Sequence, residues 1–273
     1  MGSILSGYIM PHPPAIIPEI GSEKESEVRE TISACNKVAE DVARLEPETV
    51  IVITPHGLSL ADAISITVIE ELKGDFRKWG KKDVKFEFEN DLELVNRILE
   101  KARDAHFPLE ELNESGVIRY DLAPLLDHGA LIPLYYLYSK FPKFKIVHIS
   151  MGFLEYEYLL EFGSLLREAI AESRSECVVV ASGDLSHKLS DVGSYGYNEY
   201  GAVFDKSIVD ILKSGNLSDL LKIEQDIIEE AVQCGLRSII TMAASMNESV
   251  KSEVLSYEGP LGVGYCVAKI ENG

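Results

Sequence analysis

The sequence is short of basic residues and of long apolar runs. Its 273 residues include 26 Lys and Arg against 45 Asp and Glu, which gives a formal net charge of -19. A surface this acidic repels phosphate backbones and anionic lipids, which argues against nucleic acid and membranes as partners. No segment has the apolar length of a membrane span, and the opening MGSILSGYIMPHPP lacks the basic stretch and long apolar run of a signal peptide. We therefore expect a cytoplasmic protein.

Paired cysteines and linker segments are also missing. The four cysteines, Cys35, Cys177, Cys234 and Cys266, have no CxxC spacing, so neither a zinc ribbon nor a disulfide framework is indicated. Hydrophobic residues make up 46% of the chain, enough for a large core, which excludes a disordered protein. No stretch rich in Pro, Gly or Ser marks a boundary, so we expect residues 1–273 to form a single domain. Apolar helix faces suit a core and an interface alike, which leaves both a monomer and a homo-oligomer open.

Apolar runs typical of buried strands alternate with helical patterns along the chain. Strands are predicted at ILSGYIM (4–10), TVIVIT (49–54), FKIVHISM (144–151), CVVVAS (177–182) and GVGYCVAKI (262–270). Helices are predicted over 22–45, 92–105, 129–141, 156–173 and most of 197–261. A Ser22–Glu25 capping box opens the first helix, and 64–72 and 84–90 suit a small hairpin or edge strands. This alternation predicts an α/β fold, a three-layer domain with a central, largely parallel sheet and helices on both faces.

Three histidines stand just beyond predicted strands. His12 follows GYIM, His56 follows TVIVIT, and His187 follows CVVVASGDLS. In open α/β sheets, ligands bind outside the carboxyl ends of the strands, so these three loops should converge at one rim. Prolines on both sides of His12, and Pro55 before His56, restrict the backbone and leave little ordering entropy to lose. We therefore interpret the three imidazoles as parts of one site.

The other three histidines are interpreted separately. His128 follows Asp127, a candidate helix cap, and the free N–H groups of that helix start disfavour a charged imidazole. His148 lies within a strand and is expected to be a hydrogen-bonded core residue. His106 is expected at the surface of a loop.

A metal site needs a third ligand beside two imidazoles. Two histidines and one carboxylate on one face leave open positions for substrate and O₂, as in non-haem Fe(II) sites. The candidate carboxylates are Asp184 in GDLSH and Glu229 or Glu230 in DIIEEAVQCG. Cys234 is a candidate thiolate, because a helix N-terminus and a metal both lower a thiol's pKa, and otherwise it is a small buried residue. The residues alone leave these four candidates open.

Five short motifs resemble, in order along the chain, those of the class III extradiol ring-opening dioxygenases. They are PHPP, PHG, DHGALIPL, GDLSH and CG. The match is to the LigB-type catalytic subunit of protocatechuate 4,5-dioxygenase, and the GDxxH and CG motifs are closer to the Memo branch and to the LigB-like domains of the AmmeMemoRadiSam group. The resemblance spans almost the whole chain and implies an α/β fold with one mononuclear metal at the end of the sheet.

The resemblance also implies a ligand set. The two metal-binding histidines of the family carry over to His12 and His56. Where the ring-opening enzymes have a glutamate, this chain offers Cys234, as Memo proteins do. A soft thiolate shifts preference towards zinc or copper without excluding iron. The resemblance therefore implies Fe(II) as the cofactor, with Zn(II) as the alternative.

The catalytic roles are likewise implied by the resemblance, for a small aromatic substrate of the catechol type and O₂. The family's catalytic histidine carries over to His187, which would remove a substrate proton as general base and return it as acid. The histidine that contacts substrate and oxygen carries over to His128 and would act electrostatically. Asp184 would orient His187 or a metal-bound water.

Three functions are compatible with these residues: a ring-opening dioxygenase, a Memo-like protein whose metal serves redox chemistry or partner binding, and a zinc hydrolase-like site with His187 as base. A carboxylate third ligand favours the first function, and Cys234 favours the second. No basic pair flanks the motifs in a way that would bind a substrate carboxylate. Tyr195, Tyr197 and Tyr200 could line a pocket or pack a helix, and we expect packing. The sequence therefore leaves the substrate open.

Overall fold

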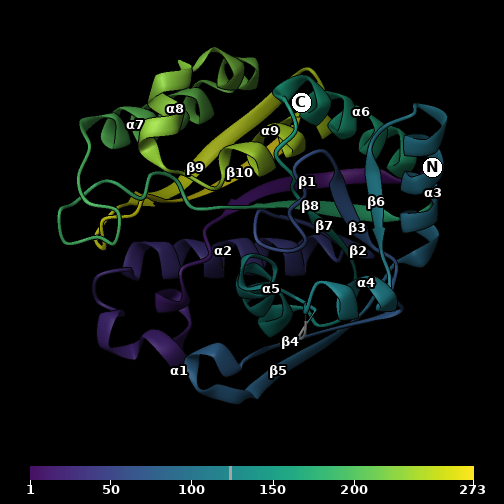
Figure 1. Cartoon of the computed structure of the whole chain (residues 1–273), viewed down its shortest axis with the longest axis horizontal. Coiled ribbons are helices and arrows are strands. Elements are labelled where there is room, and N and C mark those ends of the chain that lie inside the picture. Colours follow the sequence, from purple (N-terminus) through teal and green to yellow (C-terminus); the bar gives the residue numbers. More distant parts are fainter. Residues whose placement is uncertain (123–124) are drawn as a thin grey trace.

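A central sheet runs between two layers of helices in the computed structural model, which describes residues 1–122 and 125–273 (Figure 1). Within these residues the main sheet has eight strands in the order β6-β3-β7-β2-β8-β1-β10-β9. The strands are β1 Ser3–Met10, β2 Thr49–Thr54, β3 Ile64–Thr67, β6 Leu109–Leu112, β7 Lys145–Ser150, β8 Glu176–Ser182, β9 Val250–Glu258 and β10 Tyr265–Asn272. Strands β7, β2, β8 and β1 are mutually parallel, whereas β10 and β9 are antiparallel additions. The predicted three-layer α/β fold with a largely parallel sheet is confirmed.

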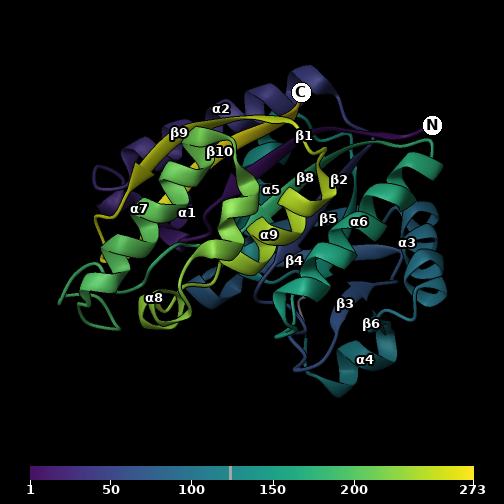
Figure 2. The same ribbon diagram turned by 90° about the horizontal axis from the view of Figure 1, so that it is seen from above.

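Helices cover both faces of the sheet (Figure 2). One face carries α2 (Arg29–Leu45) and α5 (His128–Lys140), and the other carries α3 (Leu92–Asp104), α6 (Tyr156–Glu172), α7 (Glu199–Ser214) and α9 (Leu236–Ser245). The shorter elements are α1 Pro18–Gly21, α4 Glu114–Arg119, α8 Gln225–Ala231 and the 3₁₀ turns η1 Pro14–Ile16, η2 Ser22–Lys24, η3 Arg77–Trp79 and η4 Leu217–Lys222. None of the helices in the described ranges combines the length and apolar character that crossing a membrane requires.

The continuous apolar run of β2 reflects its place in the middle of the sheet. Every residue of this strand is buried. Ile51 and Ile53 point into the core under α3, α6 and α9, while Val50 and Val52 point into the core under α2 and α5. Removing each such side chain from water contributes about 1.5–3 kcal/mol, so the central strands are held firmly from both sides.

The segment predicted as a small hairpin or edge strands has a more specific arrangement. Strand β3 lies inside the main sheet, between β6 and β7, and is not an edge. Strands β4 (Glu71–Phe76) and β5 (Lys81–Glu89) pair antiparallel as a separate two-stranded ribbon. Leu72, Phe76 and Phe88 from this ribbon pack into the core beside α5, which anchors it to the body of the protein.

Two predictions of secondary structure are wrong. The first long helix begins at Arg29 and not at Ser22, and no capping box forms, because Ser22–Lys24 is a 3₁₀ turn and the N-cap Val28 has no side-chain cap. Glu258 on β9 instead accepts the backbone N–H of Thr31 at 2.7 Å, so a distant strand supplies the partner that the first turn needs. Residues 250–258, predicted to be helical, form the edge strand β9, and β6 was also not predicted.

The parallel strands end at one rim of the sheet. Strand β8 lies between β1 and β2, so the loops after Met10, Thr54 and Ser182 are neighbours in space. The carboxyl ends of adjacent parallel strands are where α/β sheets bind ligands. This rim therefore positions the candidate site.

Asp91 at the opposite end of β2 provides a test of what holds a helix to the sheet. Its carboxylate accepts the N–H of Leu94 at 3.1 Å, capping α3, and the hydroxyl of Thr49 at 2.6 Å. We expect Asp91→Ala to lower the free energy of unfolding by about 2–3 kcal/mol, because both donors lose a buried acceptor. Asn113→Ala, which removes the exposed cap of α4, should cost about 1 kcal/mol or less. Urea unfolding midpoints at unchanged m-value measure the difference, and equal losses would contradict the role of burial.

Candidate metal centre

Three histidines from separate elements converge at the rim. His12 follows β1, His56 follows β2 and His128 is the first residue of α5. Their ligand nitrogens all lie within 4.8 Å of one another, and the Nε2 atoms of His12 and His56 are 3.0 Å apart. The rings of His56 and His128 are stacked with centroids 4.5 Å apart, and His12 meets both edge-on.

His12 is held at its backbone and at its ring by residues at the end of β8. Its N–H donates to the Asp184 carboxylate at 2.9 Å, and its Nδ1 lies 2.9 Å from the Ser182 hydroxyl. The Ser182 hydroxyl donates to the carbonyl of Gly129, so it accepts the hydrogen of His12 Nδ1. This fixes the tautomer of His12 and directs the lone pair of Nε2 towards His56.

His128 is positioned by a polar network around Asp127. Asp127 caps α5 by accepting the N–H of Ala130 at 3.2 Å, and it also accepts the Thr54 hydroxyl at 2.7 Å. His148 lies 3.1 Å from the second carboxylate oxygen of Asp127 and is only 1% exposed, which confirms that it is a hydrogen-bonded core histidine. Burial opposes ionisation of Asp127, but the hydrogen bonds from His148 and Thr54 outweigh it and hold the pKa of this carboxyl below its usual range.

The electrostatics of the cluster keep the imidazoles neutral. Burial, reinforced by the neighbouring His56, lowers the pKa of His12 to about 3. Burial, together with the charge of His12, lowers the pKa of His128 to about 4. The pKa of His56 is also lowered, first by desolvation of its ring among the neighbouring groups, although the residue as a whole is exposed. Neutral imidazole is the form that ligates metals.

The residues fit a transition-metal ion. Nitrogens bound to one zinc each lie about 2.0–2.1 Å from it, so two such ligands are at most about 4.2 Å apart, and His12 and His56 meet this limit. Nitrogen donors with a nearby sulfur suit iron, zinc and copper and not magnesium or calcium.

The four candidates for a further ligand lie in different places. Cys234 Sγ is 3.7 Å from His12 Nε2, and an Asp184 carboxylate oxygen is 4.0 Å from the same nitrogen. Glu229 and Glu230 are exposed on α8, where Glu229 bonds Gln225 and Glu230 bonds Asn198. The structure therefore brings a thiol and one aspartate to the histidines and leaves the two glutamates at the surface.

Cys234 reaches His12 because two backbones touch. A Cβ on Gly183 would lie 2.1 Å from the Cα of Gly235, so only glycine permits this approach. The backbone N–H of Asp184 then donates to Cys234 Sγ at 3.3 Å. Burial, with Asp184 nearby, raises the pKa of the Cys234 thiol, so its thiolate needs a cation beside it.

His187 is aimed by the segment that follows α8. Its Nδ1 donates to the carbonyl of Val232. Val232 has φ 50°, a left-handed conformation that is unfavourable for a β-branched residue and is typical of functional sites. Because Nδ1 carries the hydrogen, Nε2 of His187 keeps a free lone pair.

Three aromatic and basic neighbours of the site were not predicted as site residues. The ring of Tyr195 lies 5.4 Å from that of His187 and is 58% exposed, so its interpretation as a packing residue is wrong. Trp79, from η3, lies 5.8 Å from the ring of His128, and Lys78 lies beside Trp79. No local pattern places η3 at the rim, because the ribbon reaches it only through tertiary packing on α5.

Comparison with known proteins finds relatives that include a MEMO1 family protein and a dioxygenase subunit. It is 36% identical to Protein CA_C1420 of Clostridium acetobutylicum over 97% of this chain, but it spans only 57% of the length of that relative. It is 27% identical to MEMO1 family protein MJ0403 of Methanocaldococcus jannaschii, covering 81% of this chain and 68% of that one. It is 23% identical to the 2-aminophenol 1,6-dioxygenase beta subunit of a Pseudomonas species, covering 98% and 94%.

The fold also has a counterpart among solved structures. The crystal structure of uncharacterized protein JW3007 from Escherichia coli K12 superposes with a TM-score of 0.66 at 16% identity, over 98% of this chain and all of that one. Residues 6–268 match the family described as the catalytic LigB subunit of aromatic ring-opening dioxygenase. The chain therefore belongs to the LigB family.

Proposed function

We propose that the protein is a metal-dependent dioxygenase that opens the ring of a catechol-type substrate with O₂. The observation that carries the proposal is the pairing of His12 and His56, whose Nε2 atoms are 3.0 Å apart at the end of two parallel strands. Membership of the LigB family and the similarity to a 2-aminophenol dioxygenase subunit support it. The small aromatic substrate and O₂ are the partners that this reaction requires.

The proposed ligands are His12, His56 and Cys234, with Fe(II) as the metal and Zn(II) as the alternative. Fe(II), when bound, supplies redox chemistry with O₂ and a positive charge that favours the ionised catechol. Ser182 and Asp184 orient His12 towards the ion. Such partners behind the ligands set ring orientation and metal affinity.

His187 is the proposed general base. Its Nδ1 hydrogen is held by the Val232 carbonyl, so Nε2 is the atom that accepts a proton from a substrate hydroxyl and later returns it.

His128 and Asp184 have proposed supporting roles. His128 is neutral at physiological pH and carries one ring N–H, which suits donation to oxygen or substrate anions. Burial, opposed by the His12 N–H, raises the pKa of Asp184, and the carboxyl holds the backbone of His12.

A second candidate function is a Memo-like protein, in which the metal serves redox chemistry or partner binding without ring opening. The observation that favours it is Cys234, whose sulfur lies 3.7 Å from His12 Nε2 while Glu229 and Glu230 remain at the surface. Similarity to MEMO1 family proteins supports the same reading.

The first experiment separates the two functions. Protein loaded anaerobically with Fe(II) should turn a member of a catechol panel into a yellow ring-opened product once O₂ is admitted. His187→Gln should keep its metal and lose about 10²–10⁴-fold in kcat, because only proton transfer is removed. His12→Ala should fail to bind metal by elemental analysis. If no catechol is turned over while His12→Ala still abolishes metal uptake, the Memo-like function replaces the dioxygenase.

Cys234 can be tested as a ligand by spectroscopy. The Co(II)-loaded protein should show a near-ultraviolet thiolate-to-metal charge-transfer band that Cys234→Ser loses. The metal affinity of Cys234→Ser should fall at least about tenfold, because mutation of a residue that only hydrogen-bonds to a metal ligand already has an effect of that size. Cys266→Ala, which changes a buried cysteine of β10, should keep both the band and the affinity. A band that survives in Cys234→Ser would exclude the thiolate.

The buried imidazoles predict how stability depends on pH in metal-free protein. In the unfolded chain a histidine binds a proton below about pH 6.5, whereas in the folded protein the pKa of His12 is about 3 and that of His128 is about 4. Between pH 6.5 and pH 4 the unfolded state therefore binds more protons than the folded state, so the free energy of unfolding falls as the pH drops. Each such histidine contributes a slope of about 1.4 kcal/mol per pH unit. His128→Asn should reduce the slope by about one proton in urea unfolding with EDTA, whereas His106→Asn, in an exposed loop, should not. Identical slopes in all three proteins would contradict the burial argument.

A further inference from the structure

A buried carboxylate that the proposed reaction does not use lies behind the loop of His187. Asp205 belongs to α7 and is fully buried, in the stripe of that helix that also contains the apolar residues Phe204 and Ile208. Within the described ranges, no Lys, Arg or His nitrogen lies within 4.0 Å of its carboxylate. A carboxylate buried without a cation is costly to the fold, so the groups that it does bond indicate why it is there.

Two hydrogen bonds occupy the two oxygens of Asp205. One oxygen accepts the backbone N–H of Ser186 at 2.7 Å, and the other accepts the hydroxyl of Tyr257 at 2.8 Å. Burial raises the pKa of the Asp205 carboxyl to about 7, although both donors favour its ionised form. The carboxylate therefore connects α7 to β9 and to the loop that follows β8.

The neighbouring backbone leaves room for this connection at two glycines. A Cβ on Gly264 would lie 1.9 Å from the Asp205 oxygen that bonds Tyr257, and a Cβ on Gly201 would lie 2.5 Å from Ser186 Oγ. The N–H of Gly264 also donates to the carbonyl of Ser186 at 2.8 Å. Side chains at these two positions would push Asp205 and Ser186 apart, so the contact depends on close backbone approach.

Ser186 directly precedes His187, the proposed general base. The Ser186 hydroxyl donates to the carbonyl of Ala231 at 3.0 Å, and the N–H of His187 donates to the same carbonyl at 3.1 Å. The ring of His187 bonds the next carbonyl, that of Val232. These three contacts attach the loop to the end of α8, whereas the bond from the Ser186 N–H to Asp205 attaches it to α7. The chain at His187 is therefore held from two helices.

We propose that Asp205 is a positioning residue for His187. Its carboxylate fixes the peptide before Ser186, and this keeps the His187 ring in the orientation in which Nδ1 donates to Val232 and Nε2 keeps its lone pair. Asp205 acts through Ser186 and not through contact with a substrate. The role of His187 as a base rests on the proposed function, whereas its placement by Asp205 rests on the hydrogen bonds alone.

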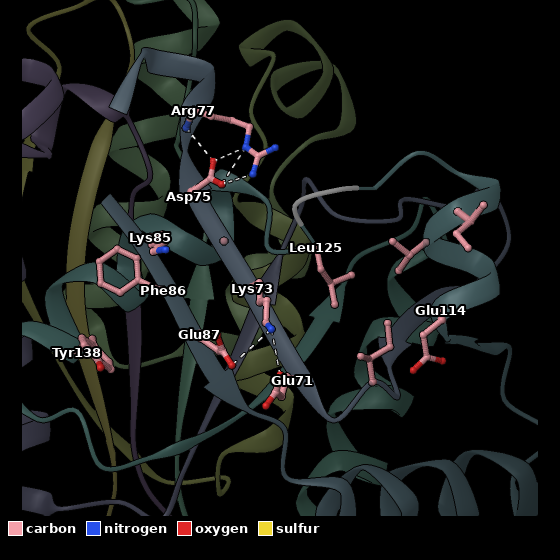
Figure 3. A pocket seen from close by; sticks show the side chains of 14 residues that line it. Glu71, Lys73, Asp75, Arg77, Lys85, Phe86, Glu87, Glu114, Leu125 and Tyr138 are labelled. Atoms are coloured by element: carbon pink, nitrogen blue, oxygen red, sulfur yellow. Dashed lines mark hydrogen bonds and ion pairs between the residues drawn. The ribbon is translucent and has the colours of Figure 1, made fainter. Parts of the chain in front are cut away.

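Two substitutions separate the hydrogen bond from the volume of the side chain. Asp205→Asn keeps an oxygen for the Ser186 N–H and can donate its amide to Tyr257, so it should preserve the loop. Asp205→Leu has a similar size but no acceptor, so the Ser186 N–H loses its partner. The matched control is Asp75→Asn, because Asp75 also accepts a backbone N–H, that of Arg77 at 2.9 Å, but in the separate β4–β5 ribbon (Figure 3).

The tautomer of His187 reports on the loop without turnover. Zn(II)-loaded protein labelled with ¹⁵N-histidine is compared by NMR at about pH 8, where imidazoles are neutral, and the His187 signals are those that His187→Gln lacks. The wild type, Asp205→Asn and Asp75→Asn should show only the tautomer with hydrogen on Nδ1, which donates to Val232. Asp205→Leu should show both tautomers, because the ring is no longer held in one orientation.

The same variants predict a specific kinetic pattern in any ring opening that the protein catalyses. In Asp205→Leu, kcat should fall about 10²-fold with KM unchanged, since displacement of a catalytic group by about 1 Å has an effect of this size. Asp205→Asn should restore most of the loss. A residue that served stability alone would lower the urea midpoint and leave kcat of the folded protein as it is.

The Ser186 amide decides the question if Asp205→Leu does not fold. A neutral amide oxygen accepts a weaker hydrogen bond than a carboxylate, so the Ser186 N–H should exchange with D₂O about tenfold faster in Asp205→Asn and at the wild-type rate in Asp75→Asn. An unchanged rate in Asp205→Asn, or a single His187 tautomer in folded Asp205→Leu, would overturn the inference. Both readouts need no turnover, so they test the placement of His187 even if no catechol is cleaved.

Discussion

The two hydrogen bonds that attach His12 to the end of β8 are the interaction on which the site depends. The Asp184 carboxylate accepts the backbone N–H of His12, and the Ser182 hydroxyl accepts the ring N–H of His12. The Ser182 hydroxyl in turn donates to the carbonyl of Gly129 in α5. One chain of buried hydrogen bonds thus links β1, β8 and the helix that starts with His128. Removing any one of these groups would leave its buried hydrogen-bond partner unsatisfied. The positions of the histidines are therefore set by the register of β1 and β8 in the sheet, and not by the conformation of single loops.

Several features of the site lower the stability of the folded protein, and they lie close to the residues of the proposed reaction. Buried neutral imidazoles resist protonation, Val232 adopts a backbone conformation that β-branched residues avoid, and Gly183 packs against Gly235 with no room for a side chain. Such strain persists only where the surrounding structure imposes it. Here the central strands, with apolar cores on both faces, provide the stability that offsets these local penalties.

Much of this architecture could be predicted from the sequence, and the exceptions have a common cause. Continuous apolar runs located β1, β2, β7 and β8, because strands buried on both faces need no polar side chains. The start of α2 was missed because Glu258, more than two hundred residues away, provides the acceptor that a local capping box would otherwise supply. The edge strand β9 was missed because its exposed face carries polar residues at strand spacing that resemble a helix surface.

By itself, the sequence determined which residues stand at strand ends, since hydrophobic periodicity places His12, His56 and His187 just beyond buried strands. Only the tertiary structure decided which other groups join them. It leaves Glu229 and Glu230 at the surface, draws Cys234 in through a contact between two glycines, and carries Lys78 and Trp79 to the rim on a ribbon packed against α5. The physical reason is that strand ends follow from local burial patterns, whereas these neighbours are set by packing between segments that are distant along the chain.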